Sequence, residues 1–260
     1  MSDARVFREM IGIGLLLVNL WIAPASADSA EEAWNSLVAE KFSKRTEFAF
    51  IENNSTLPNV LIYGDSISIH YTNRVREQLS GKANVYRIHL NGGDSASFIP
   101  KMTLMHRTMQ DSSLSDHWSF KWDVIHFNVG LHDLKYLKGR QLDKANGKQV
   151  TSIEGYEKNL RNIVAYLTEI APAAKLIFAT TTPIPIGELG RIVGDADKYN
   201  RAALKVLEFF PEVIINDIYN FTKPRHSAWW QKPGNVHYNE SGRKAQGDQV
   251  AATILRSIIH

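Results

Sequence analysis

Short apolar runs recur along the chain from about residue 58 onward, and polar or glycine-containing segments separate them. Runs of this kind are typical of strands that are buried on both faces of a sheet. Each run ends at glycine, threonine or asparagine, which indicates where the strand stops. The pattern predicts five strands, at Val60–Tyr63, Val85–Leu90, Val124–Val129, Leu176–Ala179 and Val213–Ile215.

The segments between and after these runs predict helices. We expect helices over about 69–80, 151–170, 195–209 and 240–258. Thr151 and Glu154 form a capping-box pattern, which predicts that the second of these helices begins there. Strands that alternate with helices pair in parallel through right-handed crossovers, so the sequence predicts an α/β fold, a three-layer α/β/α sandwich around a five-stranded parallel sheet.

The first 27 residues differ from the rest. Arg5 and Arg8 precede an apolar run from Ile11 to Val18, and Ala25-Ser26-Ala27 is the small-x-small pattern that signal peptidase reads. We interpret 1–27 as a signal peptide, with an uncleaved membrane anchor as the alternative. The run is short for a membrane span. We therefore expect an exported, periplasmic or secreted protein with no stable membrane span after cleavage.

The remaining length suits one α/β domain. Residues 28–57 predict a helical lead-in, and 58–260 predict the domain itself. The chain contains no cysteine, which excludes disulfides, a thiol nucleophile and cysteine-ligated zinc. The formal net charge is +3, which gives no reason to expect nucleic acid as a partner.

Polar residues that suit acyl transfer stand at the ends of the predicted strands, where parallel sheets bind their ligands. Ser66 follows the first strand in Gly64-Asp65-Ser66, although Asp65 or Ser66 would equally serve as a helix cap. Gly93 follows the second strand and His132 the third, and His237 lies in a loop before the last helix. A serine, a histidine base and N–H donors are the groups that acyl transfer requires.

These residues resemble the four motif blocks of the SGNH (GDSL) hydrolase family over roughly 58–258. The blocks are Gly64-Asp65-Ser66, Asn91–Ser95, Gly130–Asp133 and the segment around His237. The resemblance implies a flavodoxin-like sheet of order 2-1-3-4-5, Ser66 as nucleophile and His237 as base. It also implies an oxyanion hole formed by Ser66, Gly93 and the position of His132, with no cofactor and no metal. The lipase pattern Gly-x-Ser-x-Gly is absent because residue 68 is serine, which argues against the α/β-hydrolase fold.

Two positions depart from the family pattern. His132 replaces the usual asparagine, but a histidine can still donate one N–H to an oxyanion. Gly234 stands three residues before the histidine, where the family has an aspartate that orients the base. Asp217, after the fifth strand, is a possible substitute, although an aspartate there more often caps a loop. A Ser66–His237 dyad is the default interpretation.

The sequence therefore predicts an exported serine ester hydrolase that cleaves a small acyl ester, such as an O-acetyl carbohydrate, or a lipid ester. An acyltransferase and a non-catalytic glycan- or lipid-binding protein are the alternatives. Trp229 and Trp230 would stack on a sugar ring or simply pack against the protein. The basic stretch 135–148 would guide an anionic glycan or lipid head group, or form a solvated loop.

Overall fold

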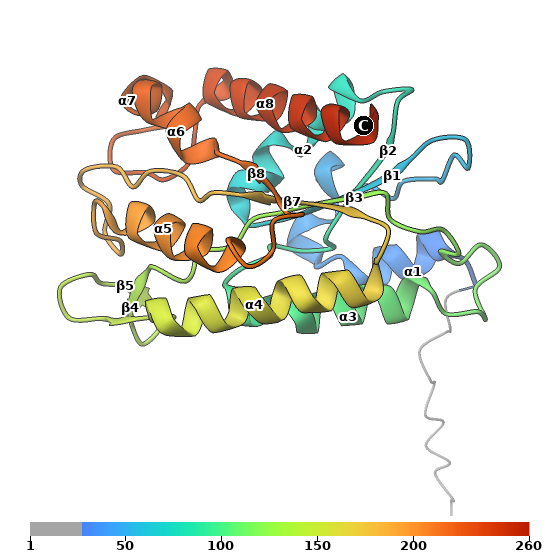
Figure 1. Cartoon of the computed structure of the whole chain (residues 1–260), viewed down its shortest axis with the longest axis horizontal. Helices are drawn as coiled ribbons and strands as arrows, with labels where there is room; N and C mark the ends of the chain where they lie inside the picture. The colour runs from blue at the N-terminus through green and yellow to red at the C-terminus, as the bar shows by residue number, and fades with distance from the viewer. Residues whose placement is uncertain (1–27, 260) are drawn as a thin grey trace, which may run out of the picture.

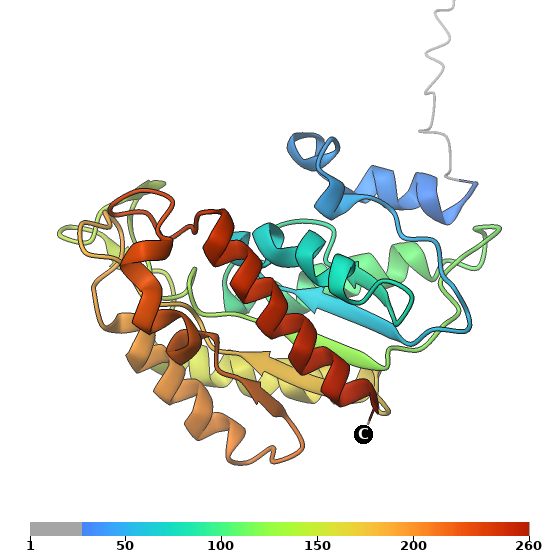
Figure 2. The same ribbon diagram turned by 90° about the horizontal axis from the view of Figure 1, so that it is seen from above.

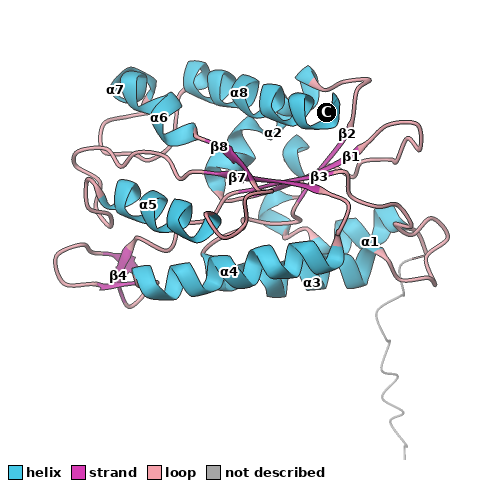
Figure 3. Cartoon of the chain, in the orientation of Figure 1, coloured by secondary structure: helices cyan, strands magenta, loops and turns pink. Residues whose placement is uncertain are grey.

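A parallel sheet of five strands forms the centre of the molecule. The computed structural model describes residues 28–259. The strands run in the order β2-β1-β3-β7-β8 (Figure 3), which is the predicted order 2-1-3-4-5. Their bounds are β1 (Asn59–Tyr63), β2 (Asn84–Arg87), β3 (Val124–Phe127), β7 (Lys175–Ala179) and β8 (Ile214–Asn216). The predicted flavodoxin-like architecture is confirmed.

Helices cover both faces of this sheet (Figure 1). On one face lie α2 (Ser66–Gln78) and α8 (Glu240–Ile259), and Figure 2 shows α8 running across that face with α2 beside it. The other face carries α3 (Phe98–Met109), α4 (Ile153–Ile170) and α5 (Asp195–Leu207). Shorter elements complete the helices, namely α1 (Ala30–Leu37), α6 (Ile218–Thr222), α7 (His226–Trp229) and the 3₁₀ turns η1 (Glu40–Phe42), η2 (Thr46–Phe48), η3 (Ser95–Ser97) and η4 (Lys223–Arg225). None of the helices among the described residues is long and apolar enough to cross a bilayer.

Several helices differ from the sequence prediction. Helix α2 begins at Ser66 instead of about residue 69, α6 and α7 lie outside the predicted helices, and two further differences concern α4 and α3. The N-cap of α4 is Ser152, whose hydroxyl accepts from the Gly155 N–H, so the predicted capping box at Thr151 is wrong by one residue. The backbone N–H of Thr151 instead donates to the Asp133 carbonyl, which holds Thr151 in the preceding loop. The second difference is α3, which lies outside the predicted elements although its buried methionines have helical spacing.

The segment 28–57 packs against the same core as the sheet. It contains α1 and two 3₁₀ turns, and Trp34 is 2% exposed. The indole N–H of Trp34 donates to the Phe48 carbonyl at 2.7 Å, which links α1 to η2. The expected signal peptide falls on 1–27, outside the described residues, and stays a prediction.

The polar stretch after β3 folds into a small antiparallel sheet of its own. Its strands are β4 (Tyr136–Lys138), β5 (Gln141–Leu142) and β6 (Lys148–Gln149), in the order β5-β4-β6. The loop after β3 leads directly into β4, so this small sheet extends from the carboxyl edge of the main sheet. The basic stretch 135–148 is therefore ordered structure beside the strand ends.

Candidate active site

The start of α2 places Ser66 at the end of β1. Asp65 is the N-cap residue, and its Oδ1 accepts from the Ile67 N–H at 2.9 Å. Ser66 is the first residue of the helix, so its own N–H has no acceptor within the helix. The motif therefore contains both a helix cap and a candidate nucleophile. Asp65 caps the helix, and the Ser66 hydroxyl is not used for capping.

The hydroxyl of Ser66 contacts His237. Ser66 Oγ and His237 Nε2 are 2.8 Å apart, although the two residues are 171 positions apart in the sequence. On the other side of the ring, His237 Nδ1 lies 2.8 Å from Asn235 Oδ1. The same oxygen accepts from the backbone N–H of His237 at 2.8 Å.

These contacts fix the tautomer of His237. A backbone N–H can only donate, so the Asn235 atom beside it must be the amide oxygen. That oxygen can only accept, so Nδ1 carries the ring proton and Nε2 is left as an acceptor for the Ser66 hydroxyl. Asn235 thereby does the orienting that the family assigns to an aspartate. Sequence reasoning missed Asn235, although an amide two residues before the histidine was visible.

The surroundings of His237 favour its neutral form. Burial, together with the charges of Arg191 and Arg243, lowers the pKa of His237 below its ordinary value. The ring of His70 lies beside it, with ring centroids 5.2 Å apart. His70 was also missed, yet it follows Ser66 by four residues, which on a helix is the same face.

The structure places Asp217 away from this histidine. Its Oδ1 accepts from the Asn220 N–H at 3.1 Å and from the Thr180 hydroxyl at 3.0 Å, so Asp217 caps α6. Among the described residues no hydrogen bond joins Asp217 to His237. The expectation that Asp217 substitutes for the missing acid is therefore not supported by the geometry, and the capping alternative is.

The backbone explains why residue 234 is glycine. Gly234 has φ +73°, and a Cβ built there would lie 3.0 Å from the carbonyl oxygen of Gly187. An aspartate at this position would need both a strained backbone and a displaced neighbouring loop. This local fold thus disfavours the carboxylate of the family pattern at position 234.

His132 lies in the same cleft as Ser66 and His237. The ammonium of Lys135 lies 3.1 Å from His132 Nδ1 and donates to it. Burial, followed by the charges of Lys135 and Arg191, lowers the pKa of His132 to about 3. His132 is therefore neutral, and because Nδ1 accepts from Lys135, its proton is on Nε2. It has one N–H to offer to a developing anion.

Gly93 is less accessible than the motif predicts. Its backbone N–H donates to the side chain of Asn91 at 3.0 Å. Asn91 lines the cleft with Ser66, whereas Gly93 is not among the residues that line it. The Gly93 N–H therefore becomes available to a ligand only when the Asn91 side chain turns aside.

Asp133 holds two of the strand-end loops together. Its buried carboxylate accepts from the Ser95 N–H at 3.0 Å and from the Ser95 hydroxyl at 2.5 Å. Burial, despite these hydrogen bonds, raises the pKa of Asp133 to about 6. The Gly92 N–H also donates to the Gly64 carbonyl at 2.9 Å, which joins the loop after β2 to the end of β1. These bonds fix the loops that surround Ser66.

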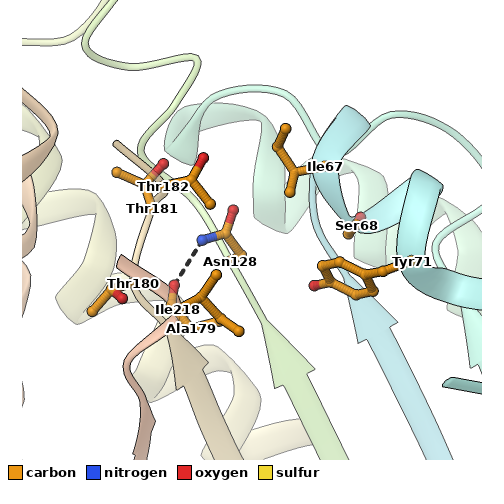
Figure 4. Close-up of a pocket in the computed structure, with 9 residues that line it drawn as sticks. All are labelled: Ile67, Ser68, Tyr71, Asn128, Ala179, Thr180, Thr181, Thr182 and Ile218. Carbon is orange, nitrogen blue, oxygen red and sulfur yellow. Dashed lines mark hydrogen bonds between the residues drawn. The ribbon is translucent and has the colours of Figure 1, made fainter. Parts of the chain in front are cut away.

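The cleft that contains these groups has a volume of about 810 Å³. Its walls come from the strand-end loops, the small sheet and the loop that carries His237. A second cavity beside Ser68 and Tyr71, shown in Figure 4, measures only about 10 Å³ and would hold at most about one water molecule. We assign the substrate site to the larger cleft. Within residues 28–259, no group of three or more His, Cys, Asp or Glu side chains is arranged to hold a metal ion.

The remaining candidates from the sequence divide between the cleft and the scaffold. Lys135 and Arg140 of the basic stretch line the cleft. Neither Trp229 nor Trp230 does: Trp229 packs against Gly242, and Trp230 pairs with Tyr238 in an isolated β-bridge. The packing alternative for the two tryptophans therefore agrees with the structure.

Comparison with solved structures identifies the fold. The chain superposes on a lipase/acylhydrolase from Enterococcus faecalis with a TM-score of 0.57 at 14% identity, covering 76% of this chain and 96% of the other. Superposition on an acetylxylan esterase from Geobacillus stearothermophilus gives a TM-score of 0.51 at 19% identity, and the match covers 77% of this chain and 94% of the esterase. Superposition on the catalytic domain of a peptidoglycan O-acetyltransferase from Streptococcus pneumoniae gives a TM-score of 0.51 at 16% identity. This match covers 78% of this chain and 95% of that domain. No family sequence model and no curated protein sequence matches the chain. The motifs, the strand order and these superpositions agree, and the chain has the fold of the SGNH hydrolases.

Proposed function

We propose that this protein is a serine ester hydrolase in which Ser66 is the nucleophile and His237 the general base. One observation carries the proposal, namely the 2.8 Å contact between Ser66 Oγ and His237 Nε2. Because the ring proton of His237 is on Nδ1, this Nε2 accepts the hydrogen bond of the Ser66 hydroxyl. A neutral histidine in hydrogen-bond contact with a serine at a helix N-terminus is the arrangement that activates a hydroxyl.

The proposed reaction has two halves. The proton of the Ser66 hydroxyl passes to His237 Nε2 while Oγ attacks the ester carbonyl carbon. The bond to the alcohol then breaks, and His237 returns the proton to the departing oxygen, which leaves an acyl-enzyme on Ser66. In the second half a water molecule gives a proton to His237 and attacks the acyl carbon. The carboxylic acid leaves, and the proton returns to Ser66.

The negative charge on the carbonyl oxygen needs donors. The Ser66 N–H lies at the first turn of α2, where the helix favours negative charge. His132 supplies a second donor through Nε2, because Lys135 occupies its other nitrogen. Gly93 supplies a third once Asn91 releases it. Burial lowers the pKa of His132 to about 3, so the ring is neutral near pH 7 and has a single N–H to donate.

Replacement of Ser66 with alanine tests the proposal. We expect Ser66→Ala to abolish turnover of a chromogenic acetyl ester and labelling by a fluorophosphonate probe, with an unchanged circular dichroism spectrum and melting temperature. Asp217→Asn is the matched control, because Asp217 caps a helix elsewhere, and this variant should keep its labelling and turnover. Full activity in Ser66→Ala would exclude Ser66 as the nucleophile.

The two alternatives are separated by their products. An acyltransferase would move the acyl group to an added sugar or glycerol acceptor, whereas a hydrolase releases free acid whether or not an acceptor is present. A binding protein would not react with the fluorophosphonate at all. The Ser66–His237 contact argues against the binding protein.

We propose in addition that the protein is exported. The support is the sequence of residues 1–27, with its basic start, apolar run and Ala25-Ser26-Ala27. Expression in a cell with a secretion pathway, followed by N-terminal sequencing, should find Asp28 as the first residue. An uncleaved chain in the membrane fraction would support the anchor alternative.

A further inference from the structure

Aliphatic side chains gather on the loops beside the cleft instead of in the core. Ile186 is 77% exposed, Leu189 72% and Val193 56%. All three belong to the loop that follows β7 at the carboxyl edge of the sheet. The side chain of Leu142 lies against this loop, because a Cβ built at Gly190 would be 2.7 Å from the Leu142 Cβ. We call the exposed aliphatic side chains of the two segments the apolar rim, which consists of Leu142, Ile186, Leu189, Ile192 and Val193.

The apolar rim is held in place by hydrogen bonds between the loop and the small sheet. The Tyr136 N–H donates to the Gly190 carbonyl at 2.7 Å, and the Lys144 N–H donates to the Leu189 carbonyl at 3.1 Å. The Lys144 ammonium donates to the Glu188 carbonyl at 2.5 Å. Both segments lie at the end of the molecule that carries α7 in Figures 1 and 2. The middle of the loop, residues 188–190, is therefore tied to the small sheet.

Positive charge lies beside the apolar rim. Lys135, Arg140 and Lys232 line the cleft next to it, and the one carboxylate in the cleft wall, Glu188, is paired with Arg191 at 2.7 Å. Three cations are thus left without a carboxylate in the cleft. Leu142 and Leu189 belong to both the rim and the cleft wall, so the charged and apolar surfaces are continuous.

This combination fits one kind of partner better than others. Exposed aliphatic side chains gain free energy when they leave water for hydrocarbon, and neighbouring Lys and Arg are attracted to anionic head groups. A polysaccharide would call for aromatic platforms, whereas the tryptophans of α7 and the following loop lie outside the cleft. We propose that the apolar rim docks on a lipid surface that carries anionic head groups, and that the cleft takes its ester substrate from that surface.

The docking step does not depend on catalysis, whereas the choice of substrate rests on the proposed function. The two can therefore fail separately. Ser66→Ala should lose turnover and keep lipid binding. If that variant instead remained active, the proposed function would fail and the lipid-binding result would still stand.

A label on the rim tests docking directly. The chain has no cysteine, so Ile186→Cys provides a single site for an environment-sensitive fluorophore. Phe209→Cys is the matched control, because Phe209 is 73% exposed but follows α5 at the opposite, amino edge of the sheet. With phosphatidylcholine vesicles that contain about one third phosphatidylglycerol, the label at 186 should shift to the blue and brighten, and the label at 209 should not.

Substitution of two residues of the apolar rim provides a second test of lipid binding. Ile186→Ser combined with Val193→Ser should weaken binding to these vesicles by about tenfold or more, and should leave turnover of a short soluble acetyl ester unchanged. Added salt, or vesicles of phosphatidylcholine alone, should weaken binding of the unmodified protein.

Three results would overturn the proposal. One is an unchanged label at 186 in the presence of anionic vesicles. Another is equal vesicle binding by the double-serine variant and the unmodified protein. The third is a blue shift with a soluble uronic-acid polysaccharide but not with vesicles, which would identify the partner as a glycan.

Discussion

Replacing Asn235 with aspartate would place a carboxylate beside His237, the proposed general base, at a position where the structure accepts one. The side chain keeps its size, and one carboxylate oxygen can still accept from both the Nδ1–H and the backbone N–H of His237, each at 2.8 Å. The tautomer is therefore unchanged. Only the charge differs, so Asn235→Asp isolates the electrostatic contribution of the missing triad member.

The size of the effect follows from the distance. Unit charges about 4 Å apart attract by about 4 kcal/mol at an effective dielectric constant near 20. The amide dipole of Asn235 already supplies part of this, and the half-buried site keeps some solvent. We therefore expect the new carboxylate to stabilise the imidazolium form of His237 by about 1.4 to 2.7 kcal/mol, which would raise the pKa of His237 by about one to two units. The same stabilisation of the imidazolium in the transition state would raise kcat by about 10- to 100-fold.

The pH profile of kcat/KM is the decisive assay, because its acid limb reports the pKa of the base in the free enzyme. In the unmodified protein, burial and two arginines lower the pKa of His237, so activity should persist below pH 6.5. In Asn235→Asp the acid limb should move to higher pH, and the plateau above it should rise. Asn235→Ala should lower the plateau, because nothing then fixes the tautomer.

A folded Asn235→Asp protein with an unmoved acid limb and an unchanged plateau would refute this reasoning. It would mean that residue 235 does not contact the Nδ1 of the working base. A raised plateau with an unmoved limb would point to another titrating group. Melting curves for each variant separate both results from a loss of fold.

Two further substitutions examine the rest of the site. Lys135→Met should lower kcat by up to about tenfold, because His132 then loses the contact that keeps its proton on Nε2, and Lys138→Met, on the exposed hairpin, should not. Steady-state kinetics on a soluble acetyl ester distinguish the two, and equal kcat values would contradict the proposed donor. Gly234→Ala should lower the melting temperature by several degrees through its positive φ and its 3.0 Å contact, whereas Gly139→Ala, with φ +61° and open space around it, should lower it less. Equal shifts in calorimetry would show that the close contact costs nothing.

Most of the fold was predictable because the apolar runs are unambiguous. A strand that is buried on both faces leaves a continuous apolar signal, and all five runs became strands of one parallel sheet. Boundaries were less certain. Whether Thr151 or Ser152 caps α4 depends on a backbone bond from Thr151 to Asp133, which no local pattern encodes. The small sheet β4–β6 has no clear signal in the sequence because its strands are short and mostly exposed.

The site was predictable only in part. Ser66 and His237 stand out because motif blocks mark them. Asn235 and Lys135 do not, because each acts through a contact with a ring nitrogen, and the direction of a side chain cannot be read from spacing alone. The motif also overstated the access to Gly93, since the neighbouring Asn91 side chain occupies its N–H.

The absence of the usual aspartate and the presence of the apolar rim have a common structural origin. Gly234 and Gly187 allow the loop that holds the histidine and the loop after β7 to approach backbone to backbone. A Cβ at 234 would lie 3.0 Å from the Gly187 carbonyl oxygen, so the loop that carries Ile186, the most exposed residue of the rim, would have to shift by a few tenths of an ångström. An orienting group at 235 avoids this crowding, because the Asn235 amide reaches His237 Nδ1 without a side chain between Gly187 and Gly234. It follows that a carboxylate added at 235 should strengthen the proposed base, whereas one added at 234 would strain the backbone and crowd the neighbouring loop in the cleft wall.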